Sequence, residues 1–232
     1  MAIGRSMVSA SVIGLPTSRH SSSASSSSGV TVSISVAQFD RNFTAMSALK
    51  PLASAGKGNV AVILPDTVTS ARYVQFDAPY LTQALTAAGL SSSQFTVQNA
   101  QGSDATQLSD AQTAITKGAT VLIMDPLDAG VGAQIETYAK SHGVAVIDYD
   151  RLTLGGSRQY YVSFNNVEVG KLIGQGFQAC ATDWKLSKPD VLVMKGDPTD
   201  NNATLFAQGY LGVLDPLFSG GSYVKAGEPA GT

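Results

Sequence analysis

The segment VAVIDYDRLTLGGSRQYYVSFNNVEVG, residues 144–170, decides the fold. It contains two short apolar runs: the first ends at Asp150 and Arg151, and the second, YYVSF, ends at Asn165 and Asn166. Nearly continuous apolar runs of this length are typical of strands in a parallel sheet whose two faces are covered by helices. Charged and amide groups at two successive strand ends indicate a binding edge rather than ordinary loops.

Strand-like and helix-like segments alternate outward from this stretch, with a repeat of about 25–35 residues that is typical of βαβ units. The expected strands are 59–66, 95–100, 119–126, 144–150, 160–164 and 190–197. The expected helices are 73–90, 104–119, 129–143, 167–184 and 203–217. The sequence therefore predicts an α/β fold with a parallel sheet flanked by helices.

The first of these helices has a clear apolar pattern. Phe76, Tyr80, Leu81, Leu85 and Ala88 are spaced so that they fall on one helical stripe, and glycine follows directly as a helix terminator. We expect this stripe to pack on the sheet.

Composition excludes several classes of protein. Hydrophobic residues make up 44% of the 232 residues, which supports a real core, while the net charge of −2 and the lack of a basic stripe argue against nucleic acid as a partner. The single cysteine, Cys180, excludes an internal disulfide and a cysteine-based metal cage, and we expect it to be a buried helix residue. No run of about 18 apolar residues is present, so no membrane-spanning helix is expected.

Motifs for cofactor and covalent chemistry are missing from the expected positions. The first turn, LPDTVTSARY, contains no glycine, so the G-x-G-x-x-G turn of dinucleotide-binding proteins is absent. A phosphate-binding loop and a G-x-S-x-G nucleophile elbow are also absent. The sequence predicts no cofactor, no metal and no enzymatic activity, although an α/β enzyme such as a nucleoside-processing protein stays as an alternative.

Polar side chains follow the strands in an unusual concentration. They are Arg72, Tyr73, Asp125, Asp150, Arg151, Asn165, Asn166, Asp197, Asp200, Asn201 and Asn202. The carboxyl ends of parallel strands meet at one edge of a sheet, where ligands of such folds bind. Carboxylate, guanidinium and amide groups can each engage two adjacent hydroxyls, and an aromatic ring can cover a C–H face. A neutral polyhydroxy ligand matches this chemistry best.

Several motifs together resemble one known family. SARYVQFD, GATVLIMDPLDA, VIDYDR, YYVSFNNVEVGK and GDPTDNNATLF are similar to segments of the type I periplasmic sugar-binding proteins of ABC transporters, most closely the D-xylose-binding branch. The resemblance runs from about residue 58 to the C-terminus. It implies two α/β lobes that close by hinge motion over a monosaccharide, with a pentose preferred, and that present the closed form to the ABC permease membrane subunits. It also implies an extracytoplasmic location, in the periplasm or on the outer face of the cytoplasmic membrane.

The resemblance assigns roles to four residues of the first lobe. Arg72 and Tyr73 match the first-loop arginine and the aromatic residue that contact or stack on the sugar. Asp150 and Arg151 match the pair that grips ring hydroxyls, although they also fit a helix cap and a surface ion pair.

The remaining expected ligand contacts lie at and beyond the crossing between lobes. FNN at 164–166 matches a family FDN, so Asn165 replaces an acidic residue beside Asn166. Asn201 and Asn202 match the DNNA stretch of the second lobe, and they also fit an N-cap cluster for the helix that follows.

The expected domain organisation has four parts. Residues 1–30 form a Ser-rich leader, 31–57 a short strand and helix, 58–164 the N-terminal sugar-binding lobe and 165–232 a partial C-terminal lobe. The leader is either a mis-assigned start or a surface tether of the kind that follows a lipid-anchored cysteine. No cysteine precedes the Ser-rich stretch in this sequence. Because family members continue further, the resemblance predicts a chain truncated at its C-terminus, whose longer parent would carry any lipid anchor.

A protein of another class shares this fold. The effector-binding core of a lactose-repressor-type transcription factor would need a basic helix-turn-helix headpiece before residue 58, and the sequence shows none there.

Overall fold

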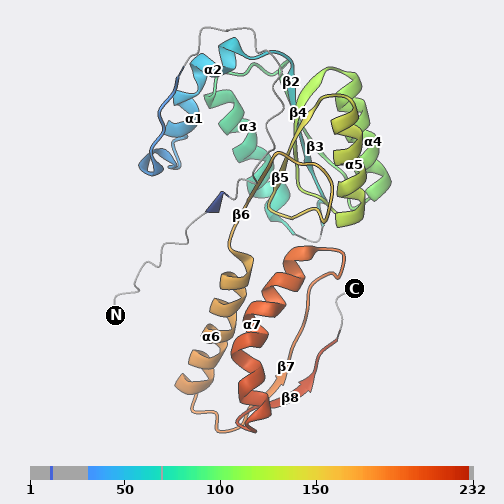
Figure 1. The fold of residues 1–232 in the computed structure, drawn as a ribbon. Coiled ribbons are helices and arrows are strands. Elements are labelled where there is room, and N and C mark those ends of the chain that lie inside the picture. The colour runs from blue at the N-terminus through green and yellow to red at the C-terminus, as the bar shows by residue number, and fades with distance from the viewer. Residues whose placement is uncertain (1–10, 13–30, 69, 230–232) are drawn as a thin grey trace, which may run out of the picture.

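The structure, a computed structural model, describes residues 11–12, 31–68 and 70–229. Figure 1 shows a larger lobe built on a sheet and a smaller lobe of helices and short strands. The elements in chain order are β1 (Ser11–Val12), the 3-10 helix η1 (Val36–Gln38), α1 (Thr44–Ala48), α2 (Lys50–Ala55), β2 (Asn59–Leu64), the π-helical turn η2 (Tyr73–Asp77), α3 (Ala78–Ala87), β3 (Phe95–Asn99), α4 (Asp104–Thr116), β4 (Ala119–Met124), α5 (Ala129–Ser141), β5 (Ala145–Tyr149), β6 (Tyr160–Ser163), α6 (Asn166–Asp183), β7 (Asp190–Leu192), α7 (Asn201–Ser219) and β8 (Val224–Gly227).

The larger lobe contains a six-stranded sheet in the order β1-β6-β5-β4-β2-β3. All neighbouring pairs are parallel except β1 and β6, which are antiparallel. The predicted α/β fold with a parallel sheet is therefore confirmed. The chain leaves the larger lobe at the end of β6 and enters α6, the first helix of the smaller lobe (Figure 1).

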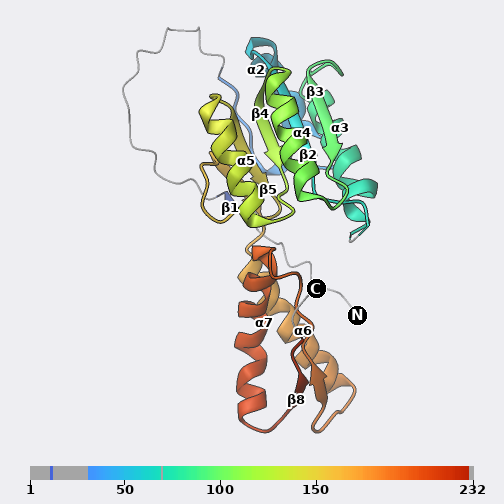
Figure 2. The same ribbon diagram turned by 90° about the vertical axis from the view of Figure 1, so that its right-hand side faces the viewer.

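Strand β2 is buried on both faces of the sheet, as its continuous apolar sequence predicts. Ala61 and Ile63 pack with α4 and α5 on one face, whereas Val62 and Leu64 pack with η2 and α3 on the other. Figure 2 shows α4 and α5 lying together across the first of these faces. The parallel pairing of β2, β4 and β5 places their carboxyl ends at one edge of the larger lobe.

The first predicted helix, 73–90, differs from its expected form. It begins as the π-helical turn η2 and continues as α3, and only the later part of the predicted stripe, including Leu85, is buried. Phe76 and Tyr80 are 51% and 53% exposed and stack on each other at 6.2 Å between ring centroids. A π turn adds about one residue to the helical repeat. The apolar stripe therefore changes direction at this turn, and Tyr73 becomes the buried aromatic residue.

The segment 31–57 also departs from expectation. It contains η1, α1 and α2, and no strand. The reason is local, because the backbone N–H of Ser35 donates to Gln38 Oε1 at 2.7 Å and closes a tight turn. Asp40 then accepts from the backbone N–H groups of Asn42 and Thr44 and starts the helical run. The predicted Ser-rich leader lies almost entirely outside the described residues.

The smaller lobe is held together by close packing of α6 and α7. Gly170 and Gly209 face each other's helices so closely that an added Cβ would overlap backbone atoms of the opposite helix. Strands β7 and β8 pair in parallel as a separate two-stranded sheet. Cys180 is exposed, contrary to expectation, because α6 buries only the face that meets α7. Among the described residues, no helix has both the length and the apolar character needed to cross a membrane.

This packing predicts opposite outcomes for two glycines of α7. Gly209→Ala should lower the free energy of unfolding by about 1–3 kcal/mol, because the new methyl group overpacks against Val167 and Lys171. Gly212→Ala on the same helix should raise it by up to about 1 kcal/mol, since nothing lies within 4 Å of its added Cβ and alanine favours the helix. Urea unfolding followed by circular dichroism measures both changes, and equal effects would contradict the close helix contact.

Candidate functional site

Four predicted site residues converge at the carboxyl edge of the larger sheet. Arg72 Nη1 lies 3.1 Å from Asp150 Oδ2, although the two residues come from different loops. The guanidinium carbons of Arg72 and Arg151 lie 5.3 and 5.9 Å from the ring centroid of Tyr73. Tyr73 is only 3% exposed, so its ring supports the two arginines rather than offering an open face. We call Arg72, Tyr73, Asp150 and Arg151, with their carboxylate partners, the arginine cluster.

The π-helical turn fixes the direction of Arg72. Arg72 Nε donates to Asp77 Oδ2 at 2.8 Å, across five residues of η2. Tyr149, at the end of β5, donates its hydroxyl to Asp77 Oδ1 at 2.9 Å. Burial alone would lower the pKa of Arg72, but the hydrogen bond to Asp77 and the charge of Asp150 raise it above its ordinary value. Asp77 was missed in the sequence because it lies inside a helical pattern, where nothing distinguishes it from a surface residue.

Asp150 has a strained backbone that turns the strand end into a hub. Its φ is +66°, in the left-handed region that aspartate tolerates better than most residues. Its carbonyl oxygen accepts from Ser163 Oγ at 2.6 Å, Tyr161 OH at 3.2 Å and Asn202 Nδ2 at 3.1 Å. These donors come from β6 and α7, so one carbonyl joins both lobes.

Arg151 connects three elements through a second set of partners. Its Nε lies 3.2 Å from Asp200 Oδ2 at the N-terminus of α7 and 3.8 Å from Asp125 Oδ1 after β4. Its Nη1 donates to the carbonyl of Leu127 at 3.2 Å. Asp200 also caps α7 by accepting from the backbone N–H of Asn202. The guanidinium therefore lies between the two lobes.

Asp125 is the most unusual member of the cluster. It is fully buried, and neither carboxylate oxygen accepts a hydrogen bond. Burial, and then the charge of Asp150, raise the pKa of Asp125 well above its ordinary value, while Arg151 opposes them. The position of Asp125 directly after a buried strand was visible in the sequence. Nothing in the sequence indicated that its carboxylate oxygens would lack hydrogen-bond partners.

The arginine cluster contains more carboxylates than guanidinium groups. Two arginines, Arg72 and Arg151, face four carboxylates, Asp77, Asp125, Asp150 and Asp200. The surplus oxygens are hydrogen-bond acceptors, and hydroxyl groups are donors that match them without adding charge. Among residues 11–12, 31–68 and 70–229, no three His, Cys, Asp or Glu side chains are grouped so that they could hold a metal ion.

The four predicted asparagines occupy different positions. Asn166 and Asn202 are both buried, and Asn166 Nδ2 donates to Asn202 Oδ1 at 2.8 Å, which links the crossing to α7. Asn165 caps α6 by accepting from the backbone N–H of Glu168 at 3.2 Å. Asn201 is the first residue of α7. Asn202 thus reaches the arginine cluster through the Asp150 carbonyl, whereas Asn165 and Asn201 make no such contact among the described residues.

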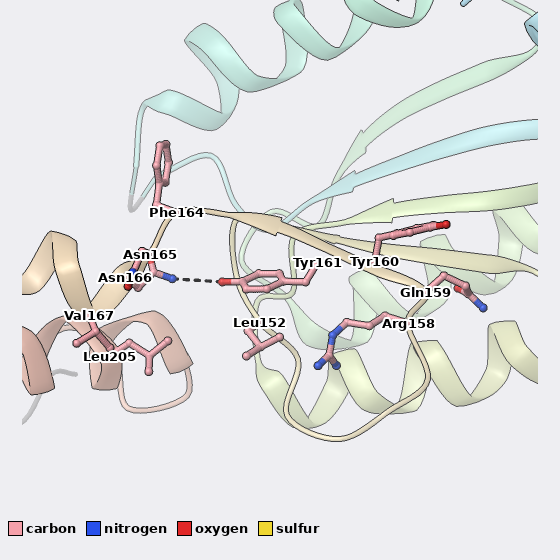
Figure 3. Close-up of a pocket in the computed structure, with 10 residues that line it drawn as sticks. All are labelled: Leu152, Arg158, Gln159, Tyr160, Tyr161, Phe164, Asn165, Asn166, Val167 and Leu205. Carbon is pink, nitrogen blue, oxygen red and sulfur yellow. Dashed lines mark hydrogen bonds between the residues drawn. The ribbon is translucent and has the colours of Figure 1, made fainter. Parts of the chain in front are cut away.

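A separate cavity of about 380 Å³ lies along β6 (Figure 3). Its lining residues are Leu152, Arg158, Gln159, Tyr160, Tyr161, Phe164, Asn165, Asn166, Val167 and Leu205. Figure 3 shows Asn166 donating to the hydroxyl of Tyr161 beneath the strand, while Phe164 points to the other side. None of the four convergent residues lines this cavity, so it is distinct from the arginine cluster.

The chain belongs to the periplasmic binding protein domain family, whose model matches residues 60–232. The predicted resemblance to type I periplasmic sugar-binding proteins is therefore confirmed. The D-xylose-binding periplasmic protein of Haemophilus influenzae is 37% identical over 134 residues, which cover 57% of this chain and 38% of that protein. The multiple sugar-binding periplasmic receptor ChvE of Rhizobium radiobacter is 32% identical over 186 residues, which cover 77% of this chain and 50% of that protein.

Solved structures agree with this assignment. An ABC transporter solute-binding protein of Clostridium phytofermentans with bound β-D-glucose superposes with a TM-score of 0.64 and 30% identity, covering 71% of this chain and 50% of that one. A carbohydrate transporter solute-binding protein of Chloroflexus aurantiacus in complex with D-glucose gives a TM-score of 0.61 and 32% identity, covering 71% of this chain and 46% of that one. The chain spans half or less of the length of these relatives.

The buried asparagine pair predicts a difference between adjacent positions. Asn202→Leu should lower the free energy of unfolding by about 1–3 kcal/mol, because Asp150 and Asn166 lose a buried partner. Asn201→Leu, at the partly exposed start of the same helix, should change it by less than about 0.5 kcal/mol. Chemical denaturation of both variants measures the difference, and a comparable loss at Asn201 would contradict a specific role of the Asn202 side chain.

The buried carboxylate of Asp125 predicts a pH effect on stability. Its folded-state pKa is raised, so the ionised form is disfavoured and stability is lost as pH rises above the ordinary aspartate pKa. Asp125→Asn removes this loss, so the stability of the variant relative to the unmodified chain should increase from pH 5 to pH 8. Asn201→Leu, which changes no ionisable group, serves as the control and should show no such trend. Thermal unfolding across this range measures both, and a pH-independent difference at Asp125 would rule out the burial effect.

Proposed function

We propose that the chain forms the sugar-binding part of an extracytoplasmic solute-binding subunit of a sugar ABC importer. The observation that carries this proposal is the arginine cluster, in which the Arg72–Asp150 pair of the larger lobe and the Arg151–Asp200 pair between the lobes meet around one buried tyrosine. Relatives named as sugar-binding periplasmic proteins, and neighbours solved with glucose, support it.

The chemistry of the cluster favours a neutral monosaccharide. Asp150 and the two guanidinium groups have the planar, two-pronged shape that engages adjacent ring hydroxyls. Hydrogen bonds to charged groups contribute about 1.5–3 kcal/mol each, so three or four of them suffice for micromolar affinity after association costs. In this proposal Asp150, Arg72 and Arg151 contact the sugar, while Tyr73 orients the arginines. Asn202 and Asn166 support the Asp150 loop, and Asn165 and Asn201 are contacts that the closed form would bring in.

Hinge motion between the lobes is the proposed mechanism. Polar contacts that join the lobes include Arg151–Asp200, the Asp150 carbonyl with Asn202, the Tyr161 hydroxyl with Asn166 and Asn202, and the Ala129 amide with the Thr199 carbonyl at 3.3 Å. A sugar hydroxyl could replace the carboxylate of Asp200 beside Arg151 without leaving either group buried and unpaired. Closure of the lobes would then be driven by the sugar's contacts with both of them.

The transport role follows from the same proposal. We expect the closed form to be recognised by the permease membrane subunits of the importer, in the periplasm or at the outer face of the cytoplasmic membrane, and the chain to bind without catalysis. A pentose such as D-xylose is the preferred ligand, on the strength of the D-xylose-binding relative. A hexose is the competing choice, because the two solved neighbours hold glucose.

A sugar panel tests the proposal directly. Isothermal titration of the chain with D-xylose, D-glucose, L-arabinose and D-ribose should show saturable binding of one or two sugars. Asp150→Asn should weaken that binding by about 10- to 100-fold, because it removes one charged hydrogen-bond acceptor. Asparagine also tolerates the left-handed backbone at this position, so the fold is kept.

The matched control lies on the exposed face of α6. Glu168→Gln removes an equivalent charge from an exposed pair with Lys171 and should leave sugar affinity unchanged. Absence of binding to every sugar, in the presence of a normally folded chain, would contradict the proposed function. If Asp150→Asn and the unmodified chain bound the sugar with equal affinity, the sugar site would have to lie elsewhere in the chain.

A further inference from the structure

A second group of charged side chains lies behind the loop that carries Asp150 and Arg151. Glu136 of α5 and Asp148 of β5 are both fully buried. Arg158, at the end of the loop 150–159, lies between them, with its Nη1 3.8 Å from Glu136 Oε1 and its Nε 3.6 Å from Asp148 Oδ2. We call Glu136, Asp148 and Arg158 the loop clamp.

The two carboxylates hold the loop by its backbone. Glu136 Oε2 accepts from the backbone N–H groups of Ser157 and Arg158, the latter at 2.6 Å. Asp148 Oδ2 accepts from the backbone N–H of Thr153 at 2.8 Å. One carboxylate thus fixes the end of the loop and the other fixes its middle.

Arg158 closes the clamp from the loop side. Its Nη1 donates to the carbonyl oxygens of Thr153 at 3.0 Å and Gly155 at 2.9 Å. Gly156 has a φ of +71°, and an added Cβ there would overlap the carboxylate of Glu136. The loop can therefore wrap the buried carboxylates closely only because residue 156 has no side chain.

This arrangement is costly for a loop that only has to join two strands. Glu136 Oε1, Asp148 Oδ1 and Thr153 Oγ1 are buried and lack hydrogen-bond partners. Apolar side chains in place of a buried ion pair often give a fold the same stability. The presence of buried charges is therefore better explained where they specify one conformation of the backbone. The loop held in this way begins with Asp150 and Arg151.

We propose that the loop clamp is a proton-dependent positioning device for the sugar site: Glu136, Asp148 and Arg158 hold the loop 150–159 so that Asp150 and Arg151 are presented to ligand. This inference rests on the proposed function and adds residues that act through the site without touching the sugar. With one proton on the carboxylate pair, the clamp is electrically neutral. Without it, two buried carboxylates face one guanidinium, and opening of the loop to water becomes favourable.

The surroundings of Asp148 set the pH range. Burial, and then the charge of Glu136, raise the pKa of Asp148 to about 7, while the hydrogen bond from the backbone N–H of Thr153 and the charge of Arg158 lower it. Within the described part of the chain, Tyr161 of β6 is a further titratable group that faces Asp148, and the neighbour of Asp148 on β4 is the uncharged Met124. Because the folded pKa is raised, the stability of the held loop is present at low pH and is lost as pH rises toward and through about 7.

The test follows the loop and the ligand separately in the full chain. Hydrogen exchange of the peptide covering 150–159, corrected for intrinsic rates, should show less protection at pH 8 than at pH 6. The affinity for the sugar identified in the panel should fall by about tenfold over the same range, as the competent protonated fraction falls. Asp148→Asn mimics the protonated carboxyl and should give a protected loop and constant affinity at both pH values. Arg158→Met should give an unprotected loop and weak binding at both.

The outcomes separate the clamp from the proposed function. A chain that binds no sugar but shows the pH-dependent loop contradicts the proposed function and supports the clamp. Loop protection that is equal at both pH values overturns the clamp, and so does affinity that stays constant while protection changes. Circular dichroism confirms the folding of each variant, and Glu168→Gln supplies the unchanged control. If a variant does not fold, the pH response of the unmodified chain decides whether the clamp depends on a proton.

Discussion

The structure depends on the sharing of each site arginine between carboxylates of different elements. Arg72 lies between Asp77 and Asp150, and Arg151 between Asp125 and Asp200. A carboxylate removed from water is costly unless a cation or a donor faces it, so these pairs fix where the loops after β2, β4 and β5 must lie. The parallel sheet brings the loops to one edge, and the shared charges decide their geometry there.

One backbone atom contributes to the joint between the lobes, beside the side-chain pairs. The left-handed conformation of Asp150 lets its carbonyl accept from Ser163, Tyr161 and Asn202, while its carboxylate pairs with Arg72. The same residue therefore serves the proposed ligand with its side chain and the second lobe with its main chain. A movement of α7 relative to the larger lobe must strain or release this carbonyl, which couples lobe position to the geometry of the site.

The sequence predicted what depends on period and order along the chain. Alternating strands and helices placed Arg72, Asp150 and Arg151 at strand ends, and a parallel sheet necessarily brings such ends together. The sequence could not predict the π turn, because one extra residue in a helix leaves no mark in composition. This turn brings Asp77 to Arg72. It also leaves Phe76 and Tyr80 facing solvent. Glu136 and Arg158 were missed for a related reason: neither directly follows a predicted strand, and only the path of the loop brings them together.

The arginine cluster and the loop clamp lie at opposite ends of the loop 150–159, and each contains two carboxylates for every guanidinium group. They differ in their access to water. In the arginine cluster the side chains of Arg72, Asp150 and Asp200 are 37%, 12% and 17% exposed, so a hydroxyl-bearing molecule can reach these three groups, whereas Asp125 is as fully buried as the clamp carboxylates. In the loop clamp the side chains of Glu136 and Asp148 are 0% exposed, so their charge can be neutralised by protonation without a ligand entering. One short segment thus joins a site that a neutral ligand could satisfy to one that a proton could satisfy. Because both groups hold the backbone of the same loop, the proposed clamp couples the free energy of sugar binding to the protonation of Glu136 and Asp148.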